Sequence, residues 1–292
     1  PREKFAANIT AIRTLKSIEK RMADGGPHAN GEEQEILAQY SGWGGLSDAF
    51  EPNKDSWHSE YTELKSLLTE EEYAAARSST LTAFYTPPEV IDAMYTTLRK
   101  MGVGAGTILE PSMGAGAFFG QSHSYLYEPT TRLFGVELDS LTGRIARQLY
   151  QKANIQITGF EKADLPDSFF DVVIGNVPFG DYSVVDPQYN RLHFKIHDYF
   201  FAKSIDKLRT GGIIAFITTS GTLDKKSEEV RRYINARCDF IGAVRLPDST
   251  FKSAGTKAMA DIIFLQKRDR ILEQDASWLH TTQTEDGLSL NS

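Results

Sequence analysis

The chain has 292 residues, of which 40% are hydrophobic and 24% are charged, so it can bury a sizeable core and disorder throughout is excluded. No apolar run reaches the roughly 18 residues that a membrane-spanning helix needs, so the sequence predicts no insertion into a membrane. Subtracting 39 Asp and Glu from 32 Lys and Arg leaves a net charge of −7. A basic coat over the whole surface is therefore excluded, and any contact with nucleic acid must be a local patch.

The start of the chain and its cysteine content bear on its origin. The single cysteine, Cys238, allows neither an intrachain disulfide nor a thiolate zinc site, and it suits a reducing, cytoplasmic location. The sequence begins Pro1-Arg2-Glu3-Lys4, without an initiator Met or the apolar stretch of a signal peptide. We interpret it as a piece of a longer polypeptide, with processing of the N-terminus as the alternative.

Residues 1–80 predict a helical N-terminal extension. Helical periodicity covers Phe5–Met22, Glu32–Tyr40 and Thr69–Arg77, and the last segment opens with a capping-box pattern. Between the helices, Tyr40–Leu46 holds Trp43 among three glycines, and we call this segment the Trp43 loop. We interpret Trp43 as a side chain that fills a neighbouring core, in preference to a ligand contact.

Residues 81–268 predict an α/β domain, because short apolar runs alternate there with helical segments. The runs are Thr107–Glu110, Leu133–Glu137, Ile155–Thr158, Asp171–Asn176, Ile213–Thr218, Ile241–Leu246 and Asp261–Gln266. The helical segments are Leu141–Gln151, His197–Leu208 and Ser227–Arg237. This alternation predicts a doubly wound, mostly parallel sheet of Rossmann-like type, whose ligands bind beyond the carboxyl ends of the strands. Residues 269–292 are polar and predict a tail or linker.

A glycine turn follows the first strand. After Glu110-Pro111, Gly114 and Gly116 let the backbone approach a ligand at the start of a helix. The spacing is not that of a dinucleotide fingerprint, and no phosphate-binding Lys follows, so dinucleotides and nucleoside triphosphates are disfavoured. Glu137 ends the next strand about 20 residues later, where doubly wound folds place the acid that accepts both ribose hydroxyls.

The third strand is followed by three further candidates for a nucleoside site. Glu161 is in a position to accept a hydrogen bond from an adenine amino group, and Phe160 would supply an apolar wall. Asp164 is a rival for the acidic role, and the sequence leaves the choice open.

The fourth strand ends in Asn176-Val177-Pro178-Phe179. This motif resembles the Asn-Pro-Pro-Tyr/Phe motif of S-adenosylmethionine-dependent methyltransferases that act on planar amino groups. The segment Tyr85-Thr86-Pro87 is similar to the one that closes over the methionine end of the cofactor in gamma-type DNA adenine methyltransferases. The resemblance covers residues 81–268 and implies S-adenosylmethionine as cofactor. The implied cofactor-binding residues are Tyr85, Thr86, Glu110, Pro111, Gly114, Gly116, Glu137, Phe160, Glu161 and Asn176.

The resemblance also implies roles at the catalytic motif. The side-chain oxygen of Asn176 and the carbonyl of Val177 would accept hydrogen bonds from the target amino group, and Phe179 would stack on a flipped-out base. Val177 stands where the family usually has its first proline. It still supplies a carbonyl, and Pro178 biases it toward extended geometry, so activity is expected. No strong base is needed, because positioning and polarisation do most of the work.

A wider resemblance includes the N-terminal part. It links the chain to the methyltransferase-like region of very large phage and mobile-element proteins, such as the DarB-type antirestriction proteins, in which that region is joined to a helicase. The segments that carry it are 41–46, 85–87, 135–139, 174–180, 196–200 and 245–247. The resemblance implies a domain of a larger polypeptide with helicase-like regions.

Our leading hypothesis is methyl transfer to the adenine amino group in DNA, either with little sequence preference or with recognition supplied by another part of the polypeptide. Lys252 and Lys257, in a polar loop where the family has a substrate-facing hairpin, are the candidate DNA contacts. The alternatives are a protein glutamine methyltransferase and a non-catalytic module that binds cofactor or DNA. His193 and His197 lie four residues apart, but no carboxylate-rich partner motif accompanies them, so we predict no metal site.

Overall fold

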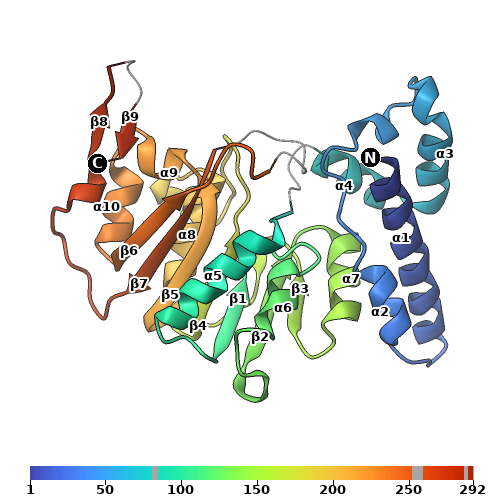
Figure 1. Cartoon of the computed structure of the whole chain (residues 1–292), viewed down its shortest axis with the longest axis horizontal. Helices are drawn as coiled ribbons and strands as arrows, with labels where there is room; N and C mark the ends of the chain where they lie inside the picture. The colour runs from blue at the N-terminus through green and yellow to red at the C-terminus, as the bar shows by residue number, and fades with distance from the viewer. Residues whose placement is uncertain (81–84, 252–258, 286–288, 292) are drawn as a thin grey trace.

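The computed structural model describes residues 1–80, 85–251, 259–285 and 289–291, and its centre is a seven-stranded sheet (Figure 1). The strand order is β3-β2-β1-β4-β5-β7-β6. β7 runs antiparallel to β5 and β6, and the other paired strands are parallel. The strands are β1 (Thr107–Glu110), β2 (Arg132–Glu137), β3 (Asn154–Ile157), β4 (Phe170–Asn176), β5 (Leu208–Thr219), β6 (Cys238–Arg245) and β7 (Ala260–Lys267). The predicted doubly wound, mostly parallel sheet is confirmed.

Helices cover both faces of the sheet, which explains its continuously apolar central strands. Val172, Val173 and Ile174 of β4 are each 0% exposed. Side chains of α8 and α10 pack with β4, β5 and β7 in one core cluster, and those of α5 and α6 pack in a second cluster on the other face. The helices of this domain are α5 (Pro88–Lys100), α6 (Ala117–Ser122), α7 (Ser140–Leu149), α8 (Ile196–Lys207), α9 (Gly221–Asp224) and α10 (Glu229–Asn235). Among the described residues, no helix combines the length and the hydropathy needed to cross a membrane.

The N-terminal extension is helical, as predicted. Its helices are α1 (Arg2–Ala23), α2 (Gly31–Leu37), α3 (His58–Leu67) and α4 (Glu70–Ser79), with the short 3-10 helices η1 (Ser47–Phe50) and η2 (Asp55–Trp57) between α2 and α3. The predicted capping box opens α4, where Thr69 and Glu72 each bond the other's backbone N–H. α3 was not predicted, because only Leu64 among its residues is fully buried and its apolar periodicity is weak.

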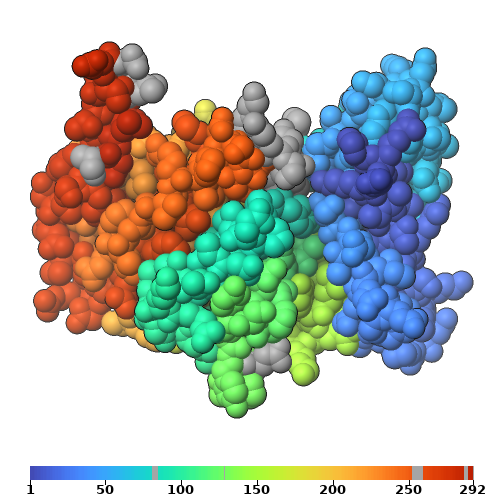
Figure 2. All heavy atoms as spheres, in the orientation of Figure 1, coloured from blue at the N-terminus to red at the C-terminus, as the bar shows by residue number. Residues whose placement is uncertain are grey.

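The extension packs against α7 of the α/β domain, and Figure 2 shows the blue atoms of the extension lying against the yellow-green atoms of this region. One apolar cluster runs from α1 and α2 to Leu141 and Ile145 of α7. Arg144 of α7 adds ion pairs to Glu72 at 2.6 Å and to Glu19 at 3.1 Å. The extension and the sheet domain therefore share a continuous core.

Trp43 fills the centre of that core and is 1% exposed. Its ring makes edge contacts with Phe50 and Phe5, with centroid separations of 5.4 and 6.2 Å. Such aromatic contacts add stabilisation beyond the buried area. The interpretation of Trp43 as a core side chain is confirmed.

The C-terminal segment was expected to be a polar tail or linker, and the structure shows it folded onto α10. It contains η7 (Ser277–Leu279) and the hairpin of β8 (Thr281–Gln283) and β9 (Ser289–Asn291). Trp278 is stacked on Phe240 of β6, and Leu279 is fully buried. The buried guanidinium of Arg231 donates to the Leu279 carbonyl at 2.7 Å. Two apolar side chains and long-range hydrogen bonds hold this segment. The sequence did not predict its fold, because neither kind of contact produces a periodic pattern.

Candidate active site

The carboxyl ends of β1, β2 and β4 meet at one edge of the sheet, because these strands are adjacent and parallel. The turn after β1 touches the acid that ends β2. Oε2 of Glu137 accepts a hydrogen bond from the N–H of Gly114 at 2.7 Å, and Oε1 accepts one from the N–H of Asp139 at 2.8 Å. The glycine turn and the strand-end acid, which the sequence singled out separately, are thus in direct contact in the structure.

Both glycines of the turn adopt backbone angles that favour glycine, with φ of +56° at Gly114 and +90° at Gly116. Gly116 precedes α6, and a methyl group at this position would lie 2.3 Å from the ring of Tyr150. The Tyr150 hydroxyl also donates to the Gly116 carbonyl at 2.7 Å. Gly116 is therefore required for packing at the turn, whereas Gly114 lies beside Glu137.

The Glu137 side chain is partly exposed and its ionisation is strongly perturbed. Burial raises the pKa of Glu137 to about 7, and the negative charge of Asp139 adds to the rise, while backbone N–H groups of Asp139, Gly114 and Leu138 offset part of it. A carboxyl group that titrates near neutrality at a strand end is typical of a functional site.

Glu110 lies deeper in the same edge and is 2% exposed. Burial, with the nearby charge of Glu137 as the second cause, raises its pKa well above the usual value. Its Oε2 has no hydrogen-bond partner among the residues that the structure describes. A buried acceptor without a partner is costly, so this oxygen is suited to receive a donor from a ligand.

Asn176 at the end of β4 is held from two sides. Its Nδ2 donates to Oγ1 of Thr86 at 3.2 Å, and its backbone carbonyl accepts a hydrogen bond from Oγ of Ser112 at 3.0 Å. With the amide nitrogen directed at Thr86, the side-chain oxygen is left as the acceptor for a substrate. Residues of three predicted motifs therefore converge at one strand end.

The replacement of proline by Val177 has a structural explanation. The Val177 side chain is 2% exposed within the core cluster of α8 and β4, and its N–H donates to the Ile217 carbonyl at 3.1 Å. Valine supplies the apolar volume, and the hydrogen bond fixes the backbone. Phe179 follows, partly exposed, and packs against the edges of both sheet-covering clusters.

Phe160, which was expected to supply an apolar wall, is largely buried. Its ring lies 4.9 Å from that of Phe200 in the core, and only 3% of the residue is exposed. Leu138, directly after Glu137, is 76% exposed and was not among the predicted site residues. The sequence alone could have pointed to this residue, because an apolar side chain directly after the acid that ends a strand lies outside the pattern of core positions.

The two rival acids differ in their surroundings. Glu161 is partly buried in the short helix η4 (Phe160–Lys162), with its carboxylate folded back over Gly159. Asp164 is exposed, and its backbone is paired with the side chain of Gln156 at 2.7 and 2.9 Å. Both stay candidates for an amino-group acceptor.

The remaining residues that the sequence singled out are two lysines and two histidines. Lys252 and Lys257 lie outside the described residues. His193 ends η5 (Asn190–Leu192), whereas His197 belongs to α8, so the two do not share a helix. No cluster of potential metal ligands is found within the described part of the chain.

The segment between Phe179 and α8 is held by a buried ion pair. Nζ of Lys203 on α8 lies 2.9 Å from Oδ2 of Asp186, and the Tyr199 hydroxyl donates to the same oxygen at 2.7 Å. Both charged side chains are less than 10% exposed, at 7% and 8%. Lys203 also donates to the Glu161 carbonyl at 3.2 Å, which connects this segment to the third strand end.

Replacing Lys203 by Met is expected to lower the free energy of unfolding by about 3 kcal/mol, because it leaves the Asp186 carboxylate buried without its cation. Urea denaturation of both proteins measures the difference. The double variant Lys203→Met/Asp186→Asn should regain much of the loss, since it removes the unpaired charge. A single-variant loss below about 1 kcal/mol would show that the pair contributes no more than an exposed one.

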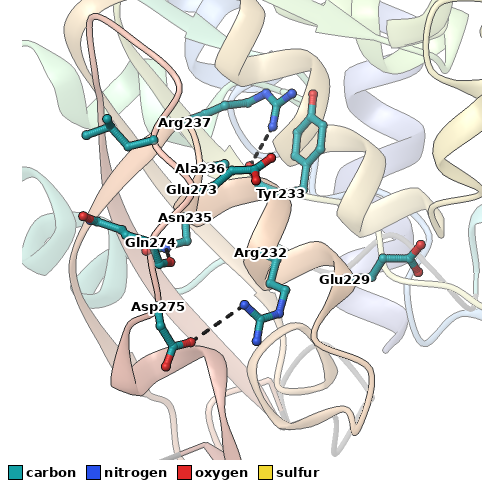
Figure 3. A pocket seen from close by; sticks show the side chains of 10 residues that line it. Glu229, Arg232, Tyr233, Asn235, Ala236, Arg237, Glu273, Gln274 and Asp275 are labelled. Carbon is teal, nitrogen blue, oxygen red and sulfur yellow. Dashed lines mark hydrogen bonds and ion pairs between the residues drawn. The ribbon is translucent and has the colours of Figure 1, made fainter.

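The cavity in Figure 3 has a volume of about 470 Å³ and lies along α10, and none of the strand-end residues above lines it. Its two arginines already have partners. Arg232 is paired with Glu228 at 2.6 Å, and Arg237 stacks on the ring of Tyr233 at 3.8 Å. The candidate site residues Glu110, Glu137 and Asn176 lie at the carboxyl edge of the sheet, away from this cavity.

The sheet order, its antiparallel β7 and the glycine turn define a class I methyltransferase fold. The chain belongs to the N-6 DNA methylase family, whose profile matches residues 67–287. Its cofactor is S-adenosylmethionine, as the family and the fold imply.

Two curated relatives place the chain further. It is 26% identical over 285 residues to the Defense against restriction protein B of Escherichia phage P1, a match that covers 96% of this chain and 11% of that protein. It is 26% identical over 156 residues to the uncharacterized protein YtxK of Bacillus subtilis, covering 49% of this chain and 46% of YtxK. The chain therefore spans less than half the length of either relative.

Solved structures share the fold at low sequence identity. The type I restriction-modification methyltransferase subunit from Streptococcus thermophilus is 18% identical with a TM-score of 0.55, over 95% of this chain and 70% of that one. The type I restriction enzyme EcoKI M protein is 16% identical with a TM-score of 0.52, over 95% and 62%. In both cases the similarity extends over the helical extension as well as the sheet domain.

Proposed function

We propose that this chain transfers a methyl group from S-adenosylmethionine to the exocyclic amino group of adenine in DNA. The observation that carries the proposal is the placement of Asn176. Its side chain is held by Thr86 with the oxygen left as acceptor, beside the partly exposed Phe179 and at the same sheet edge as Glu137. Membership of the N-6 DNA methylase family supports adenine in DNA as the acceptor.

The acceptors at the strand ends fit the cofactor. S-adenosylmethionine carries two ribose hydroxyls and an ammonium group, all of which are donors. Glu137 would accept from the hydroxyls, and the unpartnered oxygen of Glu110 is suited to the ammonium group. Gly114 would let the backbone approach between them.

The adenine end of the cofactor would lie against Leu138. This side chain offers an exposed apolar surface next to Glu137, which the buried Phe160 lacks. Of the two acids near the third strand end, we favour Glu161 as the acceptor for the adenine amino group, because it is partly buried, and a partly buried acceptor competes less with water.

The chemistry requires orientation more than proton abstraction. S-adenosylmethionine, when bound, supplies an electrophilic methyl group on a positively charged sulfur. The side-chain oxygen of Asn176 and the Val177 carbonyl would accept both N–H groups of the target amine, so that its lone pair faces the methyl group. As the new N–C bond forms, the bond between the methyl carbon and sulfur would break with its electron pair left on sulfur. The amine would then release its proton to solvent, so no strongly basic residue is required.

Replacing Phe179 by Ala is expected to lower kcat/KM for DNA by about 10- to 100-fold, because stacking of a base on an aromatic ring contributes about 1–3 kcal/mol. Phe179→Tyr keeps the ring and should retain most of the activity. Steady-state kinetics with duplex DNA measures both. An alanine variant with wild-type kcat/KM and unchanged folding would exclude a stacking role.

The acceptor class is tested by incubating the protein with methyl-tritiated S-adenosylmethionine and with DNA, RNA or protein. Label in DNA supports the proposal. Label only in protein would replace it with the glutamine alternative, since a glutamine amide is also planar. Digestion of a labelled plasmid then shows whether one short site or many sequences are methylated, which tests the expectation of little sequence preference.

A further inference from the structure

The Trp43 loop is fixed to α1 by polar contacts that its core packing does not require. Asn8 is 0% exposed, and its amide donates to the Gly42 carbonyl at 2.7 Å while accepting from the Ser41 N–H at 3.0 Å. Lys4 donates to the Gly44 carbonyl at 2.8 Å. These bonds define the path of the loop backbone at Gly42.

At that point the loop touches the segment that resembles a cofactor-closing motif. Gly42 has a φ of +65°, and a methyl group on it would lie 2.9 Å from Cε2 of Tyr85. A methyl group on Gly114 would lie 3.8 Å from Cε1 of the same ring. Opposite edges of the Tyr85 ring therefore face the Trp43 loop and the glycine turn after β1.

A second contact joins the start of the loop to the ribose side of the site. The hydroxyls of Tyr40 and Thr142 lie 3.2 Å apart, and the Thr142 N–H donates to the Asp139 carboxylate at 2.8 Å. The N–H of Asp139 in turn donates to Oε1 of Glu137 at 2.8 Å. The loop thus reaches the site by two independent routes.

We infer that the Trp43 loop is a positioning element of the S-adenosylmethionine site, in which Gly42 sets the place of the Tyr85 ring between the extension and the glycine turn. The inference rests on the proposed function only in taking Tyr85 as a cofactor contact. It assigns the extension an indirect part in cofactor binding and gives a reason for glycine at position 42. Gly42 is a positioning residue, because it would act on the cofactor through Tyr85.

The test compares Gly42→Ala with Gly25→Ala by calorimetric titration with S-adenosylmethionine. Gly25 is a matched control, because it has a similar φ of +81° in the same extension but nothing within 4 Å of a methyl group placed on it. Both variants carry the same kind of backbone strain, which thermal unfolding records. We expect Gly42→Ala to weaken cofactor binding by about 10-fold or more through displacement of the ring, and Gly25→Ala to stay within about twofold of wild type.

Two further measurements separate a positioning role from a loss of folding. In a Tyr85→Ala background, Gly42→Ala should cause no additional loss of affinity, because its effect acts through the ring. In the wild-type chain, S-adenosylmethionine should slow hydrogen exchange of the amides in Tyr40–Leu46 while leaving α3 unchanged. Equal affinities of the two glycine variants, or no protection of the loop, would overturn the inference.

The outcomes are distinct from those for the proposed function. A wild-type chain that binds S-adenosylmethionine but does not methylate DNA would contradict the proposed function, whereas the titrations of the two glycine variants alone decide this inference. A folded wild-type chain that does not bind the cofactor would overturn both.

Discussion

Replacing Asn176 by Ala should lower kcat for methyl transfer to DNA by about 10²- to 10³-fold, the loss typical when one preorganised polar group at a reacting centre is removed. The reason is that the target amine loses the side-chain acceptor that orients its lone pair. Thr86 would also lose its donor, but the Asn176 carbonyl that bonds Ser112 is retained in the variant. Single-turnover kinetics with saturating cofactor isolates this step from binding.

The matched control is Asn154→Ala, at an exposed position at the start of β3. It should leave kcat unchanged. If Asn176→Ala retained more than about a tenth of the wild-type rate, the motif would be structural. A loss that small can result from a change in packing or stability alone.

Affinity for S-adenosylmethionine should rise as the pH increases through about 7, the pKa to which burial raises Glu137. Below that pH the free protein holds Glu137 protonated, so the carboxyl must release a proton before both oxygens can accept the ribose hydroxyls. Above it the group is already ionised and affinity reaches a plateau. The direction follows from linkage, because the cofactor binds the ionised form more tightly.

Glu137→Gln should weaken cofactor binding at pH 8 by about 10- to 100-fold, the range for losing hydrogen bonds to a charged acceptor. It should also flatten the pH dependence near neutrality. Calorimetric titrations from pH 5.5 to 8.5 test both effects, with Glu89→Gln, an exposed residue at the start of α5, as control. A wild-type affinity that falls as pH rises through 7 would contradict the assigned role of Glu137.

The sheet is readable from the sequence because its signal is local. Runs such as Ile213–Thr218 are continuously apolar, and only a strand covered on both faces requires that pattern. The helix α5 was missed although Pro88 at its first turn is a recognised start signal. The fold of the C-terminal segment was not predicted, because the segment is held by the distant Arg231 and by two isolated apolar side chains.

The site was predicted to the extent that its residues follow strand ends. Glu137 and Gly114 lie where the strand order requires, and Asn176 is bonded to residues of two other motifs. The burial of Phe160 could not be predicted, because an aromatic residue after a strand fits a ligand wall and a core equally well, and only tertiary packing decides between them. The contact between Gly42 and Tyr85 joins segments about 40 residues apart and has no signature in either one.

The most direct test of the account is to incubate plasmid DNA with the protein and S-adenosylmethionine, digest it to nucleosides and identify the methylated product by mass spectrometry, with Asn176→Ala in parallel. The account predicts N6-methyladenine in the wild-type reaction and its near absence with the variant. Methylated cytosine, or unmodified DNA from a protein that binds the cofactor, would contradict it.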